Sequence, residues 1–352
     1  MGRRNSSRAY LRPPGRYPSP VSPAVHGEPG ANAPALSVLL LSHDYARFLG
    51  ASLASVLAQS FDSFEVIVLD DGSTDDSLEV AAGFACDPRV RIVAHDRNEG
   101  FVATLIEGTG TLSRGEFLVM VSADDVVLDP RAFAAQVARL RDEPRAVACM
   151  TAFRKIVPGG DGEIRRLLPG NRTITGAEFA RRVLTEREFS VMHSGTVIRA
   201  SAYHAAGGYR RDLSNYGDFA LWLALARIGR VAVIDRPCYG YRLHEAQMSG
   251  KPERRRAVLR EGLAVLRAEA VTARAAGLPI SDARALRTRG ADLALADAFA
   301  GRRSLALLRC GDLLALAPGI AVTSGGWWLA AGRALLGERA WRALAAVRRR
   351  FR

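Results

Sequence analysis

The sequence predicts an α/β protein with a mostly parallel sheet, followed by a helical C-terminal region. From Ala35 onward, short apolar runs alternate with segments of helical periodicity, the pattern of parallel strands joined by crossover helices. Two of these runs end in carboxylate pairs, Asp70-Asp71 and Asp124-Asp125, at the strand ends where ligands bind in such sheets. From about Pro252 the sequence becomes rich in Ala, Leu and Arg with helical spacing.

The first strand and helix are expected at the start of this pattern. Leu36–Leu41 is a continuous apolar run, typical of a strand buried on both faces. Asp44 follows it and is expected to cap a helix. That helix carries a single apolar stripe, which runs from Leu49 to Leu57.

Three more strands are expected before residue 126. Phe64–Leu69 runs directly into Asp70 and Asp71, which begin a turn that leads to a helix. The third and fourth strands are expected at Val90–Ala94 and Phe117–Val121.

The second half of the chain is organised differently. Residues 146–250 hold fewer clear strands, with a capping box at Thr175–Glu178 and a helix near Asp218–Ile228. Seven of the 16 prolines fall within residues 1–34, which predicts a disordered tail there. The predicted organisation is therefore this tail, an α/β domain at 35–250 with halves 35–125 and 126–250, and a helical Arg-rich region at 251–352.

The charge of the chain argues against nucleic acid as a partner. The net charge is +13, but residues 1–34 carry five Arg against one Glu, and residues 333–352 carry seven Arg against one Glu. Only +3 remains for the 298 residues between them, whereas a protein that wraps a phosphate backbone carries its charge on the folded body. Basic ends are typical of solvated tails or of attraction to anionic lipid.

The rest of the composition predicts a cytoplasmic protein. The four cysteines lie at least 63 residues apart and form no CxxC pair, which argues for a reducing compartment and against a thiolate zinc site. No apolar run follows the basic start, so no signal peptide is expected. Leu313–Gly332 is 20 residues long and uncharged, but its proline and four glycines argue against a membrane-spanning helix.

The C-terminal 20 residues carry a pattern of their own. Trp341, Leu344, Val347 and Phe351 recur at helical spacing among seven arginines. This pattern fits a helix lying on an anionic membrane surface, at the inner face of the cell membrane. A terminal helix packed on the folded domain, with a solvated basic face, fits it nearly as well.

The two carboxylate pairs predict a cation. A buried strand-end pair of this kind needs a cation or a proton, and hard oxygen ligands at a phosphate site suit Mg²⁺ or Mn²⁺. Taken alone, Asp124-Asp125 would also fit a solvated turn that caps the helix starting near Pro130. Two such pairs on neighbouring strands favour the ligand site.

Several further segments occur in a fixed order. They are Ser37–Asp44, Ser55–Phe61, Phe64–Asp75, Asn98–Gly100, Ser122–Asp125, Gly207–Tyr209, Asp218–Trp222 and Tyr241–His244. Together they resemble the motifs of glycosyltransferase family 2, over about residues 35–250. The resemblance implies the nucleotide-sugar-binding sandwich called GT-A. It also implies an inverting transferase that uses a nucleoside-diphosphate sugar of the UDP, dTDP or GDP type, a divalent cation, and a sugar or lipid-linked acceptor.

The resemblance also implies a role for each matching residue. Leu41, Ser42 and His43 would line the nucleotide pocket, and Asp71 would accept a hydrogen bond from the base. Asp124 would lie near the ribose. The cation would be held by Asp125, with His244 as a metal or diphosphate contact. Asp218 would be the general base that removes the proton of the acceptor hydroxyl.

The sequence departs from the family pattern at two positions, and it also bears on other possible functions. The family's usual Asn is Asp44 here, and its Glu-Asp pair is Gly217-Asp218. A sugar nucleotidyltransferase or a dehydrogenase would need a Gly-rich loop after the first strand, and Leu41–Tyr45 contains no glycine. A non-catalytic nucleotide-sugar-binding or scaffold relative is disfavoured because both Asp125 and Asp218 are present.

Overall fold

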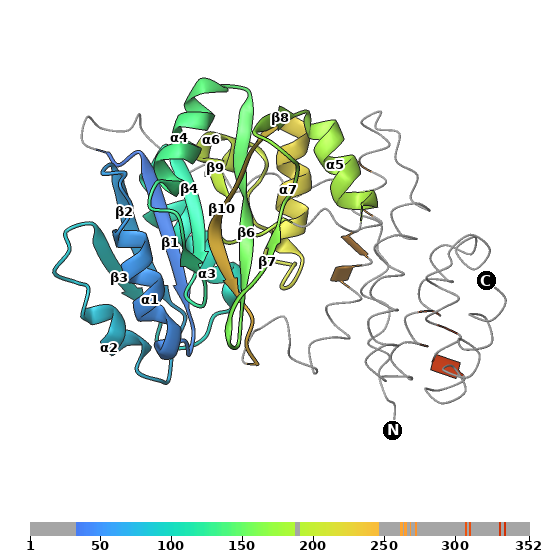
Figure 1. Ribbon diagram of the computed structural model, residues 1–352. Helices are drawn as coiled ribbons and strands as arrows, with labels where there is room; N and C mark the ends of the chain where they lie inside the picture. The colour runs from blue at the N-terminus through green and yellow to red at the C-terminus, as the bar shows by residue number, and fades with distance from the viewer. Residues whose placement is uncertain are drawn as a thin grey trace.

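The computed structural model describes residues 33–186 and 191–245, with isolated helical positions between 261 and 335 (Figure 1). The predicted tail, most of the helical region 251–352 and nearly all of Leu313–Gly332 and the amphipathic C-terminal segment lie outside the described residues. Within the described parts, no helix is both long enough and apolar enough to span a lipid bilayer.

The predicted α/β fold is confirmed by a ten-stranded sheet within the described residues. Its first four strands are β1 (Leu36–Ser42), β2 (Phe64–Asp70), β3 (Val90–Ala94) and β4 (Phe117–Ser122). They pair in parallel in the order β3-β2-β1-β4, as Figure 1 shows. Each matches its predicted range to within one residue, because a short and mostly apolar run between two turns leaves little choice of element.

The sheet continues into the second half of the domain through an antiparallel strand. β9 (Val197–Arg199) lies between β4 and β6 (Ala146–Val157), and β6 pairs in parallel with β10 (Arg230–Arg242). Three short antiparallel strands complete the sheet: β5 (Val126–Val127), β7 (Gly160–Arg165) and β8 (Arg172–Ile174). The strands β1–β4, β6 and β10 therefore run in one direction.

The prediction of fewer strands in residues 146–250 is wrong, because five of the ten described strands lie there, including β6 and β10, the longest. The sequence of β10 hides its strand character. Asp235, Arg236 and Pro237 interrupt its apolar pattern, and the pairing with β6 shifts register between Ile234 and Tyr239. Such irregularities break the two-residue alternation by which a strand is recognised in sequence.

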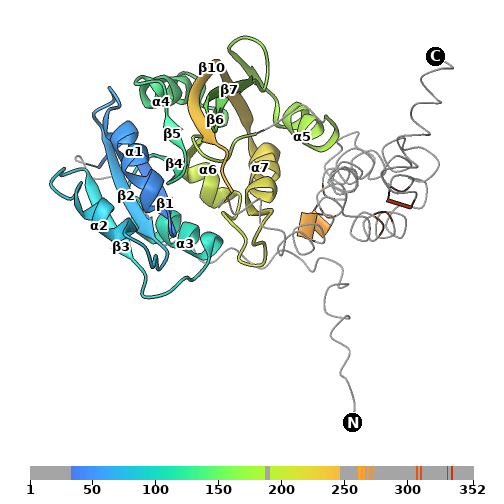
Figure 2. The same cartoon turned by 60° about the horizontal axis from the view of Figure 1, so that its bottom comes forward.

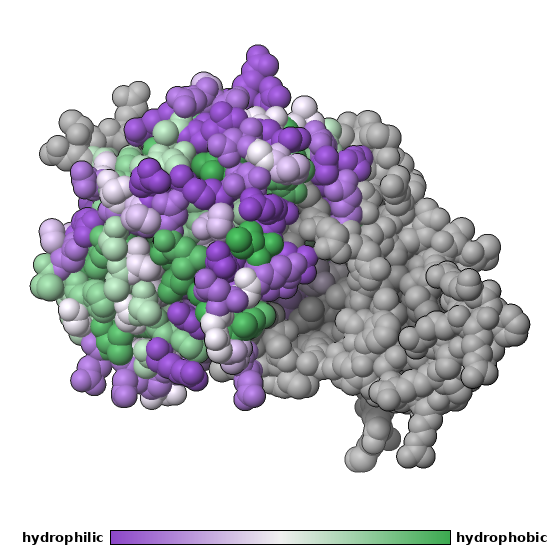
Figure 3. Space-filling model, viewed as in Figure 1, coloured by the Kyte–Doolittle hydropathy of each residue, from purple (hydrophilic) through white to green (hydrophobic). Residues whose placement is uncertain are grey.

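Helices cover both faces of the sheet (Figure 2). One core cluster packs α1 (Ala46–Leu57), α2 (Ser77–Ala82) and α4 (Ala132–Asp142) against the sheet. The cluster on the other face contains α3 (Phe101–Glu107), α5 (Gly176–Thr185), α6 (Ala200–Ala205) and α7 (Gly217–Ile228). The predicted helix at Asp218–Ile228 is confirmed, and its Trp222 is a core residue with 2% of its surface exposed. Figure 3 shows an apolar patch over α1, surrounded by hydrophilic residues.

Two predicted helix caps have different outcomes. Thr175 caps α5, since its Oγ1 accepts a hydrogen bond of 3.1 Å from the Glu178 backbone N–H. Asp44 does not cap α1, and that prediction is wrong. Its backbone is left-handed, with φ 56°, and its carboxylate accepts instead from the Thr74 N–H at 2.7 Å. The cap prediction failed because an Asp before a helix can equally adopt the left-handed conformation and bind a neighbouring loop.

Candidate active site

The predicted site residues meet at one edge of the sheet, where the parallel strands end. The Asp71 N–H donates to the Ser42 carbonyl at 2.9 Å, and the Ala123 N–H donates to the Leu41 carbonyl at 2.8 Å. These bonds join the ends of β1, β2 and β4. The end of β10 joins the same edge, because the Arg242 N–H donates to Asp125 Oδ1 at 3.1 Å.

Asp71 is clamped by the segment that follows β3. Its Oδ1 accepts from the Glu99 N–H at 2.8 Å and lies 3.0 Å from His95 Nδ1, while its Oδ2 accepts from the Gly100 N–H at 2.9 Å. Burial opposes the charge of this carboxylate. The hydrogen bonds from His95 and the two backbone groups outweigh that effect, so the pKa of Asp71 lies below its ordinary value. Asp71 is thus held as an ionised hydrogen-bond acceptor.

His95 is a site residue that sequence reasoning missed. It directly follows β3 at the same sheet edge, and its ring bridges Asp71 and Glu107 of α3. Its position one residue beyond a predicted strand was the available signal, since the neighbouring strands also carry polar residues at their ends.

Gly72 allows the two loops beside Asp71 to pack closely. Its φ is +67°, and a Cβ built there would lie 2.4 Å from the Arg97 carbonyl carbon. The β2–α2 and β3–α3 loops therefore pack backbone to backbone beside Asp71, which only glycine permits.

We expect Gly72→Ala to lower the free energy of unfolding by about 1–3 kcal/mol, because the new side chain combines a positive φ with a backbone clash. Chemical denaturation measures this effect. The control is Gly110→Ala, because a Cβ at Gly110 meets nothing within 4 Å. Equal losses of stability in both variants would contradict the prediction.

The second carboxylate pair is buried at the end of β4. The side chain of Asp124 is 10% exposed; its Oδ1 accepts from the Ser122 hydroxyl, and its Oδ2 lies 3.0 Å from His244 Nε2. Burial and the neighbouring Asp124 charge raise the pKa of Asp125 well above its ordinary value, and Arg242 opposes this shift. The pair is therefore no solvated turn. It does not cap α4 either, because the N-cap of that helix is Arg131.

These residues fit a divalent cation that is shared with a substrate. Among the residues that the structure describes, no three His, Cys, Asp or Glu side chains are arranged to hold a metal ion. Mg²⁺, however, is commonly bound by one or two carboxylates together with substrate phosphates and water. Two adjacent buried carboxylates satisfy that requirement, and the repulsion between their charges falls when a cation binds.

The end of β1 carries two buried polar atoms that have no hydrogen-bond partner among the described residues. Ser42 Oγ and His43 Nδ1 are buried and make no hydrogen bond to any described residue. Such groups are costly unless a ligand or water satisfies them. Both belong to the segment predicted to line the nucleotide pocket.

Asp218 lies in the first turn of α7, which packs on the same face of the sheet as α3. Its Oδ1 accepts from the Phe219 N–H at 2.7 Å, and its charge acts on the nearby His193 and Tyr209. His193 Nε2 lies 2.5 Å from the Tyr209 hydroxyl, and its ring makes an edge contact with Phe101, at the start of α3. Burial lowers the pKa of His193, and the charge of Asp218 opposes that shift. Through His193, Asp218 is connected to Phe101 at the start of α3, which follows the Glu99 and Gly100 N–H groups that bind Asp71.

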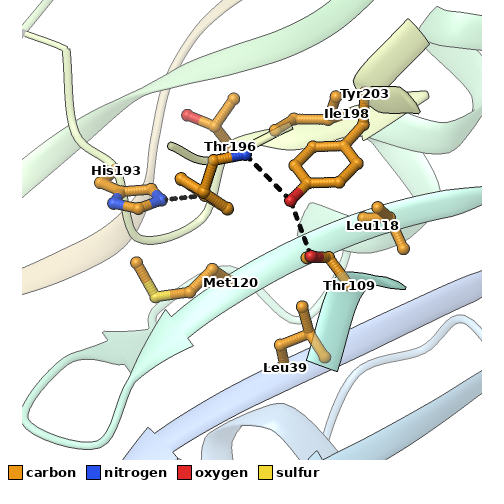
Figure 4. A pocket seen from close by; sticks show the side chains of 9 residues that line it. Leu39, Thr109, Leu118, Met120, His193, Thr196, Ile198 and Tyr203 are labelled. Carbon is orange, nitrogen blue, oxygen red and sulfur yellow. Dashed lines mark hydrogen bonds between the residues drawn. The ribbon is translucent and has the colours of Figure 1, made fainter. Parts of the chain in front are cut away.

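A small cavity lies behind His193 (Figure 4). Its volume of ≈ 10 Å³ suffices for about one water molecule. Tyr203 fills one side, and its hydroxyl lies 2.8 Å from Thr109 Oγ1. The cavity is too small for a sugar, so a substrate would bind at the sheet edge instead.

Comparison with known proteins identifies the family. Residues 37–207 match the family described as Glycosyl transferase family 2. The chain is 27% identical over 227 residues to an uncharacterized glycosyltransferase of Haemophilus influenzae, covering 62% of this chain and 68% of that one. It is 27% identical over 222 residues to a chondroitin synthase of Escherichia coli, covering 62% of this chain and only 30% of the synthase. Residues 37–207 therefore form a glycosyltransferase family 2 domain.

Solved structures confirm the GT-A type of fold. The S. aureus TarS 1–349 structure in complex with UDP-GlcNAc superposes with a TM-score of 0.64 at 15% identity, over 90% of this chain and 92% of that one. The match to a longer TarS structure spans 42% of that chain. A mannosyltransferase from Pyrobaculum calidifontis, solved with GDP-Man and Mn²⁺, gives a TM-score of 0.51 at 18% identity, over 86% of each chain.

Proposed function

We propose that this protein transfers a sugar from a nucleoside-diphosphate sugar to an acceptor hydroxyl, with inversion at the anomeric carbon. The observation that carries the proposal is the convergence of two buried carboxylate sites at one sheet edge. Asp71 follows β2 as an ionised acceptor, and Asp124-Asp125 follow β4 as a pair that needs a cation. The Asp71 carboxylate suits a nucleotide base that donates an N–H, and the Asp124-Asp125 pair suits a diphosphate with its metal.

In the proposed reaction Asp218 accepts the proton of the acceptor hydroxyl as its oxygen attacks the anomeric carbon. The bond from that carbon to the diphosphate oxygen breaks, and its electron pair leaves with the nucleoside diphosphate. Leu41, Ser42 and His43 line the nucleotide pocket, with Asp124 near the ribose. Asp125 and His244 are the proposed ligands of Mg²⁺ or Mn²⁺, which when bound would neutralise the charge developing on the leaving group.

The comparisons suggest classes of donor and acceptor. The solved relatives are titled as complexes with UDP-GlcNAc and GDP-Man, and two curated relatives are named chondroitin and hyaluronan synthases. We therefore propose a UDP-, dTDP- or GDP-sugar donor and a sugar or lipid-linked acceptor, in the synthesis of a bacterial cell-surface polysaccharide or glycolipid. Residues 35–250 form the proposed catalytic domain.

The test is a screen of UDP-, dTDP- and GDP-sugars that measures release of the free nucleoside diphosphate, with Mg²⁺ or Mn²⁺ and a panel of sugar and lipid-linked acceptors. We expect release with one donor class, and more of it when an acceptor is present. Absence of binding and of turnover for every donor would reject the proposal.

The basic C-terminal segment suggests where the enzyme acts. We expect the chain to co-sediment with anionic vesicles at low salt, because each basic residue near such a surface contributes about 1 kcal/mol. A chain truncated after Gly332, which lacks seven arginines, should lose this binding. Neutral vesicles are the control. Equal, salt-independent binding by both chains would contradict peripheral attachment at the inner face of the membrane.

A further inference from the structure

His95 connects three elements of the nucleotide side of the site. It follows β3, its Nδ1 lies 3.0 Å from Asp71 Oδ1 beyond β2, and its Nε2 lies 2.7 Å from Glu107 Oε2 at the end of α3. The side chain is only 15% exposed. Because an ionised carboxylate can only accept hydrogen bonds, both ring nitrogens must donate to complete this bridge. The geometry therefore requires the imidazolium form.

The charged groups around His95 support the same protonation state. Asp71 faces it from the end of β2 and Glu107 faces it from α3, and no other described basic side chain pairs with either carboxylate. The Asp70 carboxylate accepts hydrogen bonds from the Ser73 N–H and hydroxyl. In the loop of His95 itself, Asp96 is exposed, and Arg97 pairs with Glu99 at 2.7 Å. The hydrogen bond with Asp71 is the main cause of a raised His95 pKa; burial opposes it, and Glu107 adds to it.

We propose that His95, as an imidazolium, is a positioning residue that holds Asp71 in place to accept a hydrogen bond from the donor's base. This inference rests on the proposed function, in which Asp71 contacts that base. The two backbone N–H groups of Glu99 and Gly100 fix Asp71 from the loop side. The bridge to Glu107 fixes it from the helix side, so that the carboxylate cannot rotate when the base binds.

The bridge makes nucleotide binding depend on pH. A histidine whose folded pKa is raised contributes fully below its unfolded value of about 6.5, and its contribution disappears as the pH rises through the raised value. Nucleotide affinity should therefore fall as the pH rises through this raised pKa, when one hydrogen bond of the bridge is lost. Asp71, with its lowered pKa, stays ionised throughout that range.

The experiment measures binding of UDP, dTDP and GDP, each with Mg²⁺, between about pH 6 and pH 9. It compares the wild-type chain with Glu107→Gln, His95→Gln and the control Glu116→Gln. Glu116 has the same side-chain exposure as Glu107, 42%, and its neutralisation also removes ion pairs, those with Arg141 and Arg199. It precedes β4, however, and so lies at the opposite edge of the sheet. Ionisation of the diphosphate itself affects all four proteins equally, so the differences between them report on the protein.

We expect wild type and Glu116→Gln to lose nucleotide affinity over the same range of rising pH. Glu107→Gln should show that loss at lower pH, and His95→Gln should bind about tenfold more weakly near neutrality and without this pH dependence. Ring NMR signals of His95, assigned by their absence in His95→Gln, should titrate above the ordinary range in wild type and at lower pH in Glu107→Gln. Identical binding profiles in wild type and Glu107→Gln would overturn the proposal, as would a His95 ring that titrates at or below the ordinary histidine pKa. Failure of every nucleotide to bind to wild type would reject the proposed function itself, and with it the role assigned to His95.

Discussion

Asp218→Asn is expected to lower the rate of sugar transfer by about 10²–10⁴-fold while leaving donor affinity nearly unchanged. Asparagine keeps the size of the side chain and can still accept from the Phe219 N–H, so α7 should keep its start. It cannot take the proton of the acceptor hydroxyl. The proposed nucleotide-binding residues lie at the ends of β1, β2 and β4, so the loss should appear in kcat and not in the donor Kd. Steady-state kinetics with a saturating donor, together with direct nucleotide binding, measure the two effects.

The control for this variant is Asp212→Asn, a nearby exposed carboxylate that pairs with Arg210. It should retain full activity. If Asp218→Asn instead weakens donor binding as severely as Asp71→Ala does, Asp218 is part of the donor site and is not the general base.

Asp125→Ala is expected to lower turnover by about 10²-fold or more, because a bound cation contributes several kcal/mol to the charge that develops on the leaving group. Asp125→Asn should behave similarly, although it keeps an acceptor for the Arg242 N–H. In the absence of metal, Asp125→Asn should not unfold at a lower temperature than wild type, since it removes a buried charge beside Asp124. Loss of activity without loss of stability is the signature of a functional carboxylate.

Turnover assays and thermal unfolding, with and without Mg²⁺ or Mn²⁺, measure both effects. The exposed Asp142 at the end of α4 provides the control, Asp142→Ala, which should keep its activity. Full activity of the wild-type enzyme in excess chelator would contradict a metal-dependent mechanism.

The first half of the domain was predictable because its signals are local. The runs Leu36–Leu41 and Phe64–Leu69 are apolar apart from Ser37 and Glu65, and each ends in a polar turn that also marks the site. β10 was missed because its bulge around Pro237 interrupts the pattern. The bridge at His95 was missed for another reason. Its partners Asp71 and Glu107 are 24 and 12 residues away in sequence, and only the packing of α3 beside β2 and β3 brings the three together.

The backbone contact at Gly72 has a consequence for how chain length can vary among relatives. Two loops that touch through their main chains must keep their lengths together, because an added residue in either would separate Asp71 from the Glu99 and Gly100 N–H groups. The turn between β6 and β7 is under no such restriction, since Cβ atoms built on Gly159 and Gly160 meet nothing within 4 Å. Insertions and fused tags should therefore be tolerated at that turn, while the loops beside Asp71 should keep a constant length in enzymes that bind their donor in this way.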